Sequence, residues 1–271
     1  MVLCAMAGCG EYYTATKYAD AEYKYELAKS CYTMGQYTRA TELFTDLVVA
    51  MKGSGNAQEC PYMAGLSAYH AGDLETAAQT FKKYYQSYPR GIFVEQARYY
   101  SGKALYDNVP DPRLDQSTTN RAIAELQGFL DAYPYTTLRE QTQDMIFKLQ
   151  DHLVQKEVLA AQLYYNLGSY VINCSYGGSN YEACIVTAEN ALRDFPYAST
   201  EKREQLSILV LRSRYHLARQ SIEEKRVERF RQTIDEYYGF VNEFPESAYL
   251  KEARTYLTKS EKAVKGQPLD D

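Results

Sequence analysis

The residue types that most often carry out catalysis are scattered along this chain. The 3 histidines, His70, His152 and His216, lie far apart, and no serine-nucleophile, HExxH, phosphate-loop or dinucleotide-binding motif is present. Carboxylates are frequent, but they fall on predicted solvent-exposed helix faces. A lone carboxylate or histidine there rarely forms a site, because catalysis needs several converging groups. The sequence therefore predicts no enzymatic activity and no cofactor.

The 6 cysteines show no metal-ligand spacing either. They stand at positions 4, 9, 31, 60, 174 and 184, without a CxxC pair or clustered histidines, so a zinc site is not expected. Cys31 lies among apolar residues and is predicted to pack as a small hydrophobic side chain. Cys174 and Cys184 flank the pair Gly177-Gly178. They either form a disulfide in an oxidising compartment or remain two buried thiols.

Tyrosine is the most distinctive residue type, with 28 Tyr against 9 Phe and no Trp. Its flat ring and polar hydroxyl suit either a helical core or a surface that a partner covers. Three segments, 25–32, 62–69 and 99–106, each begin and end with Tyr and recur at an interval of 37 residues. A small residue follows three places after the first Tyr, namely Ala28, Gly65 and Gly102. This register indicates an internal repeat.

Each repeat is predicted to be a helix pair of the tetratricopeptide type. The small residue lets the second helix cross closely, and Gly72 follows the first helix, where a positive φ is needed. Ala77 and Phe81 lie four residues apart and share the face that packs on the first helix. The equivalent residues of the first repeat are Gly35, Ala40 and Phe44. Because Pro cannot continue a helix, the repeats close at Tyr88-Pro89, Tyr133-Pro134, Phe195-Pro196 and Phe244-Pro245.

We expect an all-α solenoid of five helix pairs in two lobes. Repeats 1–3 form an N-terminal lobe over 21–135, and repeats 4 and 5 with a capping helix form a C-terminal lobe over 136–265. The segment 136–171 has no Pro and helical periodicity, so one long helix, or two in line, is expected to join the lobes. The remaining expected features are insertions at 107–119 and 173–180, a capping helix over 247–264 and a disordered tail at 266–271.

The recurring tyrosines are predicted to line a client-peptide groove. Two Tyr seven residues apart lie on one stripe of a helix, and first helices line the concave face of a tetratricopeptide stack. Such a surface suits an extended peptide with alternating aromatic side chains, whose C-terminal carboxylate or acidic residues the lysines would meet. The groove residues are Tyr25, Lys29, Tyr32, Tyr62, Leu66, Tyr69, Tyr99, Lys103 and Tyr106. Alternatively, the same rings pack as core between repeats.

The first residues are similar to the end of a bacterial lipoprotein signal. Met6, Ala7 and Gly8 precede Cys9, as an apolar and two small residues precede the lipidated Cys of that family. The similarity implies cleavage before Cys9 and its acylation with palmitate-type chains, leaving 1–8 as a signal remnant and 9–20 as a linker. The alternative is an ordinary cytosolic N-terminus, because the charged region of a signal is missing. No run of about 18 apolar residues predicts a transmembrane helix.

The charge distribution limits the class of partner. With 30 basic and 35 acidic residues the net charge is -5, which argues against nucleic acid because a phosphate backbone requires a basic face. The stretch 201–232 is instead rich in basic residues. Arg212 and Arg219, seven residues apart on one stripe, are predicted to dock on acidic groups of a partner, with Arg214 as a weaker candidate. The alternative is a solvated helix face.

The combination resembles the BamD family of outer-membrane protein assembly lipoproteins, in a form typical of Bacteroides-like Gram-negative bacteria. It consists of Cys9, five repeats of which the last four close with Tyr-Pro or Phe-Pro, and the segments 115–122, 149–157 and 192–196. The resemblance implies a protein anchored by lipid to the periplasmic face of the outer membrane. It implies docking on the POTRA domains of a BamA-like barrel-inserting subunit, contact with other Bam lipoproteins, and reception of unfolded outer-membrane proteins by their aromatic-rich C-terminal strand.

One further function class fits the repeats. Other periplasmic tetratricopeptide lipoproteins serve as scaffolds in cell-envelope coordination or as accessories of glycan uptake. Glycan-binding members carry Trp and Tyr platforms on long loops, whereas this chain has no Trp. A division coordinator would add a coiled coil, and no sustained heptad is present.

Overall fold

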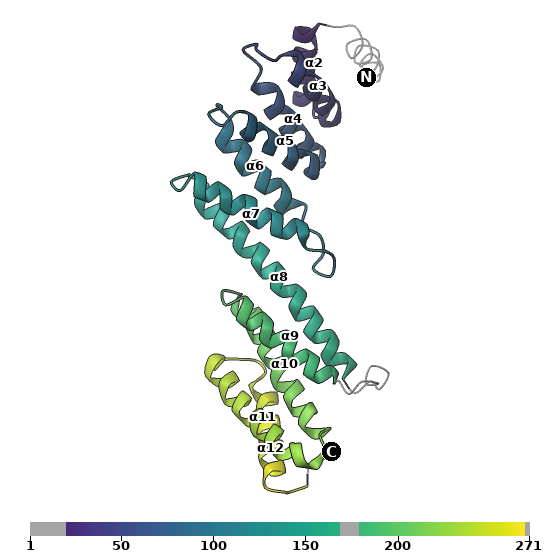
Figure 1. The fold of residues 1–271 in the computed structure, drawn as a ribbon, viewed down its shortest axis with the longest axis vertical. Helices are drawn as coiled ribbons and strands as arrows, with labels where there is room; N and C mark the ends of the chain where they lie inside the picture. The colour runs from purple at the N-terminus through teal and green to yellow at the C-terminus, as the bar shows by residue number, and fades with distance from the viewer. Residues whose placement is uncertain (1–19, 169–178, 269–271) are drawn as a thin grey trace, which may run out of the picture. The chain divides into compact units, whose positions relative to one another are not determined.

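The computed structural model describes residues 20–168 and 179–268, and every regular element in these ranges is an α-helix (Figure 1). Consecutive helices pack against one another as in a tetratricopeptide solenoid. This arrangement confirms the all-α repeat fold predicted from the 37-residue register.

The chain forms two compact units, Met1–Leu149 and Gln150–Asp271, which divide inside one helix. That helix, α8 (Arg139–Leu167), is a single continuous element where one long helix or two in line were expected. Several expected features lie outside the described residues. These are the signal remnant 1–8, the acylated Cys9, Cys174, most of the insertion at 173–180 and the end of the tail.

The first unit contains three helix pairs followed by the start of α8. The pairs are α2 (Ala21–Thr33) with α3 (Tyr37–Ala50), α4 (Glu59–Ala71) with α5 (Leu74–Ser87), and α6 (Val94–Asp107) with α7 (Ser117–Ala132). The side chain of Asp20 caps α2 by accepting the N–H of Tyr23 at 2.7 Å. Gly72 ends α4 with a φ of 84°, and Gly35 follows α2 with a φ of 73°, as predicted.

The helix pairs cross closely at the small residues of the first helices. A Cβ atom on Gly65 would lie 2.8 Å from a ring carbon of Phe81. A Cβ atom on Gly102 would lie 2.6 Å from Cδ2 of Leu126. Real Cβ atoms do not approach other atoms this closely, so a larger residue at either glycine would force the helices apart.

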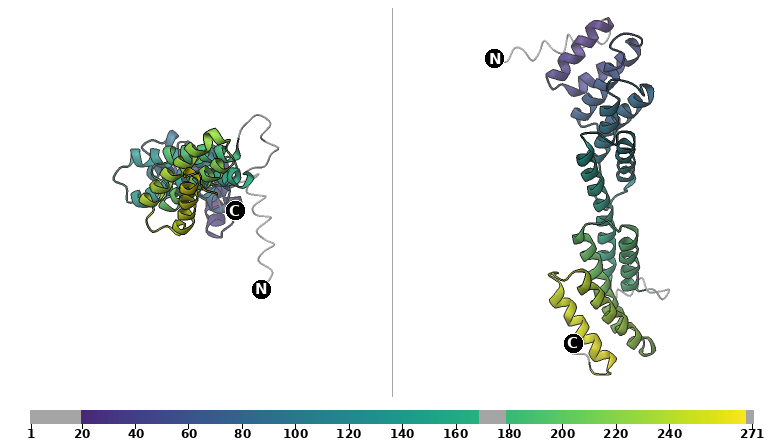
Figure 2. Two further views of the ribbon diagram at one scale, coloured as in Figure 1. Left: turned by 90° about the horizontal axis from the view of Figure 1, so that it is seen from below. Right: turned by 90° about the vertical axis from the view of Figure 1, so that its left-hand side faces the viewer.

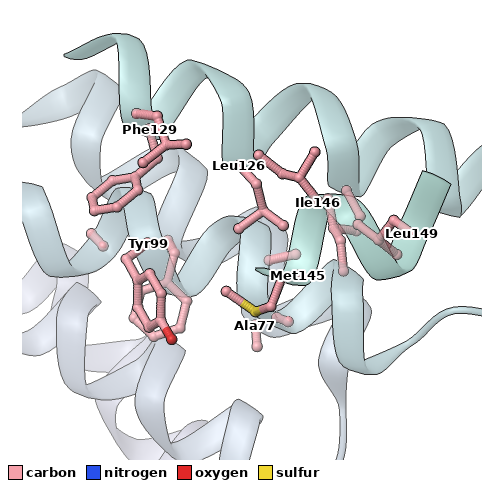
Figure 3. Close-up of a cluster of buried hydrophobic side chains, with 14 of the residues drawn as sticks. Ala77, Tyr99, Leu126, Phe129, Met145, Ile146 and Leu149 are labelled. Atoms are coloured by element: carbon pink, nitrogen blue, oxygen red, sulfur yellow. The ribbon is translucent and has the colours of Figure 1, made fainter. Parts of the chain in front are cut away.

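The core of the second and third repeats extends to the start of α8 (Figure 3). Tyr99 and Phe129 pack edge to face with their ring centroids 5.7 Å apart. Leu126, Met145 and Ile146 belong to the same buried cluster. Burial of these apolar side chains is the main stabilising contribution to the unit.

The second helix of each later repeat ends at the aromatic residue before proline. The four residues have nearly the same backbone angles, with φ between -121° and -129° and ψ between 65° and 68°. A following Pro excludes the helical conformation, so the chain leaves the helix there. Twelve positions before each Pro lies a fully buried residue, namely Ala77, Ala122, Cys184 and Thr233.

The second unit contains the rest of α8 and four further helices. These are α9 (Asn180–Asp194), α10 (Thr200–Arg219), α11 (Glu223–Glu243) and α12 (Leu250–Val264). The helix α10 contacts α9, α11 and α12 (Figure 2). Val154 and Val158 of α8 are buried with Cys184 and Leu206. The helix α12 occupies the place predicted for the capping helix at 247–264.

Candidate peptide-binding surface and charged groups

The first tyrosine of the repeated segments lies in or near the core. Tyr25 and Tyr99 are each 5% exposed, and Tyr62 is half-buried. Tyr62 stacks on Phe93 with centroids 4.3 Å apart. Leu66 is also half-buried and packs on the core of the second repeat. For Tyr25 and Tyr99 the structure thus gives the packing role that was the alternative to the groove.

The second tyrosine of each segment is half-buried and reaches the surface. Tyr32 contacts Tyr37 and His70, with ring centroids 5.5 and 5.9 Å apart. Tyr69 contacts His70 and Tyr100, both at 5.5 Å. Tyr32, Tyr37, Tyr69, His70 and Tyr100 thus form one set of adjoining rings, here called the aromatic surface, on α2, α3, α4 and α6.

Three members of the aromatic surface were not predicted. Tyr37, His70 and Tyr100 have no Tyr at the equivalent positions of the neighbouring repeats. A pattern of identical residues at a fixed interval therefore does not include them. Two of them have one signal, adjacency to a repeated position, because Tyr100 follows Tyr99 and His70 follows Tyr69. Tyr106 is half-buried and packs against the core of the second and third repeats, and among the described residues its ring contacts no ring of this surface.

The tyrosines are of two kinds, according to whether their hydroxyl groups are hydrogen-bonded to other residues. Tyr25 donates to Glu59, Tyr69 donates to Asp107 at 2.5 Å, and Tyr99 is hydrogen-bonded to Gln141. Each of these bonds reaches an element later in the chain. These hydrogen bonds link successive elements. Such partners are usual, because most buried hydroxyls are hydrogen-bonded.

The hydroxyls of Tyr32, Tyr62 and Tyr100 have no hydrogen-bond partner among residues 20–168 and 179–268. The three groups are near enough to influence one another. Burial, followed by the charges of Tyr100 and Tyr32, raises the pKa of Tyr62 to about 12. Burial, followed by Tyr37 and Tyr100, also raises the pKa of Tyr32. Three polar groups from α2, α4 and α6 therefore lie near one another, in and beside the aromatic surface, without a hydrogen bond to the described residues.

The two predicted groove lysines already have anionic neighbours. Lys29 lies 3.3 Å from Glu26 on the exposed surface of α2, with its Nζ 5.1 Å from the Tyr25 ring centroid. Lys103 Nζ lies 2.9 Å from Asp107 and 5.6 Å from the Tyr69 ring centroid. Burial lowers the pKa of Lys103, but hydrogen bonds with Tyr69 and Asp107 outweigh it and raise the pKa. Lys103 therefore stays charged.

Arg212 is half-buried and forms a bidentate ion pair within the second unit. Its Nε and one terminal nitrogen each donate to a carboxylate oxygen of Glu252 at 2.7 Å. The guanidinium lies 5.2 Å from the ring centroid of Tyr249 and 6.0 Å from that of Tyr165. Hydrogen bonding to Arg212 lowers the pKa of Glu252 in spite of burial. This pair links α10 to α12.

The other two predicted docking residues differ in exposure. Arg214 is half-buried and bonds Glu236 of α11 at 2.9 Å and also Glu189 of α9. Burial raises the pKa of Glu236, although Arg214 lowers it. Arg219, at the end of α10, is exposed. Of the three arginines, Arg219 alone thus presents its side chain mainly to solvent.

The described cysteines are buried free thiols. They are Cys31, Cys60 and Cys184. Burial raises the pKa of all three, that of Cys60 to about 11, so none is present as a reactive thiolate at neutral pH. Cys31 packs in the core of the first repeat as predicted. Within 20–168 and 179–268, no three His, Cys, Asp or Glu side chains converge in a way that would hold a metal ion.

The family of the chain follows from comparison with known proteins. No curated protein matches it. None of the described helices has both the length and the apolar character needed to cross a bilayer. The sequence profile of YfiO, described as an outer membrane lipoprotein, matches residues 25–175, more than half of the 271 residues. This span contains every residue of the aromatic surface, and the chain belongs to the YfiO family of outer membrane lipoproteins.

Proposed function

We propose that the protein is a non-catalytic component of the β-barrel assembly machinery, anchored by an acylated Cys9 at the periplasmic face of the outer membrane. It receives unfolded outer-membrane proteins by their C-terminal strand and docks on the POTRA domains of the barrel-inserting subunit. Membership of the YfiO family supports the compartment and the anchor. The observation that carries the client role is the aromatic surface together with the unpartnered hydroxyls of Tyr32, Tyr62 and Tyr100, the second of which lies beside it.

The chemistry of the aromatic surface suits an aromatic strand. Stacked and edge-on rings provide contact area for client side chains without large loss of side-chain freedom. The hydroxyls of Tyr32, Tyr62 and Tyr100 can bond the backbone groups that an extended peptide leaves exposed. A purely structural cluster would need no hydroxyl at these places, because Phe would pack as well.

Site-specific photo-crosslinking tests the client role. A photoreactive phenylalanine analogue at Tyr32 or Tyr100 should crosslink a newly secreted outer-membrane protein, and deletion of the client's last strand should abolish the product. The same analogue at Val49, which is 79% exposed on α3, is the control. Equal crosslinking from Val49, or crosslinking that survives the deletion, would contradict client binding at the aromatic surface.

Purification from solubilised membranes tests the partner. A tagged protein should recover the barrel-inserting subunit and other lipoproteins of the machinery. Recovery of a peptidoglycan synthase or a sugar transporter in their place would favour the alternative of a different periplasmic scaffold.

Membrane fractionation tests the anchor. With a complete signal, Cys9→Ser should leave the outer-membrane fraction, because the acyl chains hold the protein there. Mass spectrometry of the mature N-terminus should show an acylated Cys9 in the wild type. An unmodified N-terminus would disprove the lipid anchor.

A further inference from the structure

A carboxylate is bound beside the aromatic surface by two donors from different helices. Tyr69 Oη of α4 donates to Oδ2 of Asp107 at 2.5 Å. Lys103 Nζ of α6 lies 2.9 Å from the same oxygen and 3.3 Å from Oδ1. The Tyr69 ring itself contacts His70 and Tyr100, so this small site adjoins the aromatic surface.

Local helix electrostatics do not favour Asp107 at this position. It is the last residue of α6, where the partial negative charge of the helix end repels a carboxylate. The order Lys103 then Asp107, four residues apart, is also the weaker orientation for a helical ion pair. The side chain is therefore held mainly by the two donors, and a competing carboxylate would displace it at little cost.

We propose that Tyr69 and Lys103 form a subsite for the C-terminal carboxylate of a bound peptide, and that Asp107 fills this subsite until the peptide arrives. The inference rests on the proposed client role, because the peptide reaches the subsite along the aromatic surface. A terminal carboxylate has the same two oxygens as the Asp107 side chain and follows directly on the last aromatic residue of such a peptide. Asp107 thus acts as an internal competitor that selects for a free C-terminus.

The test measures binding of three labelled peptides to the full chain by fluorescence anisotropy. All share alternating aromatic residues and end in Phe. One has a free carboxylate, one a C-terminal amide, and one the amide plus an internal Glu. Wild type should prefer the free carboxylate. Asp107→Asn should strengthen binding of that peptide about two- to fivefold, the factor that an exposed charge pair contributes, and leave the amide unchanged. Lys103→Met should abolish the preference.

Asp131→Asn is the matched control. Asp131 lies on α7, accepts a hydrogen bond from Gln127 of the same helix, and carries the same charge change. It should bind all three peptides like wild type. Both Asn variants should still unfold cooperatively, because an amide oxygen at position 107 can accept the hydrogen bond from Tyr69. A gain for Asp131→Asn equal to that for Asp107→Asn would refute the subsite as an effect of net charge alone.

The remaining outcomes separate the subsite from the client role. If the peptides bind but Asp107→Asn changes the affinities of the acid and the amide equally, the subsite is refuted and the aromatic surface stands. If Asp107→Asn strengthens binding of the internal Glu peptide equally, the subsite binds an acidic side chain and not specifically the terminal carboxylate. Absence of binding by every peptide to every variant would overturn the client role together with the subsite.

Discussion

At the residue scale, hydrogen bonding distinguishes tyrosines that the repeat register makes equivalent. Tyr25, Tyr62 and Tyr99 share one register position, yet the hydroxyls of Tyr25 and Tyr99 are bonded to later elements. The Tyr62 hydroxyl has no partner in the described chain, and the same holds for Tyr100 on the aromatic surface. The hydroxyls of the first group therefore stabilise the fold, whereas those of the second are the ones that we propose bond a client peptide.

Removal of single hydroxyls should separate these two roles. Tyr25→Phe deletes a hydrogen bond to the carboxylate of Glu59 and should lower the free energy of unfolding by about 1–3 kcal/mol. Tyr100→Phe keeps the ring and should change it by less than about 0.5 kcal/mol, while it weakens peptide binding. Urea unfolding of the full chain measures both values. Equal losses of stability in the two variants would contradict the division.

His216 of α10 is enclosed by aromatic rings. It stacks on Tyr181 with centroids 5.2 Å apart and an interplanar angle of 15°. Tyr165, Tyr215 and Tyr256 also lie against it, at 6.0, 5.4 and 6.3 Å. Burial, followed by the charges of Arg219 and Lys259, lowers its pKa below the ordinary 6.5. The folded unit therefore holds this imidazole neutral.

This lowered pKa has a consequence for stability against pH. The folded state binds fewer protons than the unfolded state, so the contribution of His216 is complete above pH 6.5 and is lost as pH falls below that value. In His216→Gln, the fall in stability as the pH decreases below about 6.5 should become shallower. Denaturant titrations at several pH values measure the slope, and proton NMR follows the imidazole directly. An unchanged slope in the variant would show that another group is responsible.

At the element scale, the fold depends on how closely paired helices approach. Gly102 of α6 lies against both the side chain and the backbone of Leu126 in α7. Gly128, also in α7, would present a Cβ atom to open space. The two glycines belong to the same helix pair, α6 and α7. They differ in whether a Cβ atom would meet a neighbouring helix.

Substitution of these glycines by alanine should have opposite effects. Gly102→Ala places its Cβ 2.6 Å from Leu126 and should destabilise the protein by about 1–3 kcal/mol through overpacking. Gly128→Ala should stabilise it by about 0.5–1 kcal/mol, because Ala loses less backbone freedom in a helix. Thermal unfolding of both variants measures the difference. A loss of stability at Gly128 similar to that at Gly102 would show that close helix crossing is not the cause.

The elements were predictable from the sequence because local signals define them. Gly35 and Gly72 have positive φ, and each aromatic residue before Pro ends a helix. The candidate site was only partly predictable. Which rings reach the surface depends on the rotation of each helix against its neighbours, and Tyr37 and His70 join it without repeating. The carboxylate partners of Tyr69 and Arg212 lie 38 and 40 residues away and belong to no sequence pattern.

At the scale of the whole molecule, the two units carry different candidate contacts. The first holds the aromatic surface, and the second holds the arginines predicted to dock on the barrel-inserting subunit. The structure changes how that docking can be tested. Arg212 and Arg214 each hold carboxylates of their own unit, so their charge reversal would disturb packing as well as any interface.

Charge reversal can nevertheless separate docking from stability. Arg212→Glu places two carboxylates together between α10 and α12 and should lower the free energy of unfolding by about 1–3 kcal/mol, because the pair is partly shielded from solvent. Adding Glu252→Arg reverses the pair and should restore much of that stability. Arg219→Glu changes an exposed side chain that interacts with Tyr215 and should lower the free energy of unfolding by less than about 1 kcal/mol.

Copurification of the barrel-inserting subunit is the readout for these variants. If the end of α10 docks on acidic groups, Arg219→Glu reduces recovery, whereas Arg231→Glu, an equal change at an exposed position of α11, does not. The reversed pair at positions 212 and 252 decides the role of Arg212. If the reversed variant is stable but no longer recovers the barrel-inserting subunit, Arg212 belongs to the interface. In that variant the fold is kept and only the positions of the two charges are exchanged. Normal recovery by that variant and by Arg219→Glu would remove this face from the interface and leave Arg212 as the link between α10 and α12.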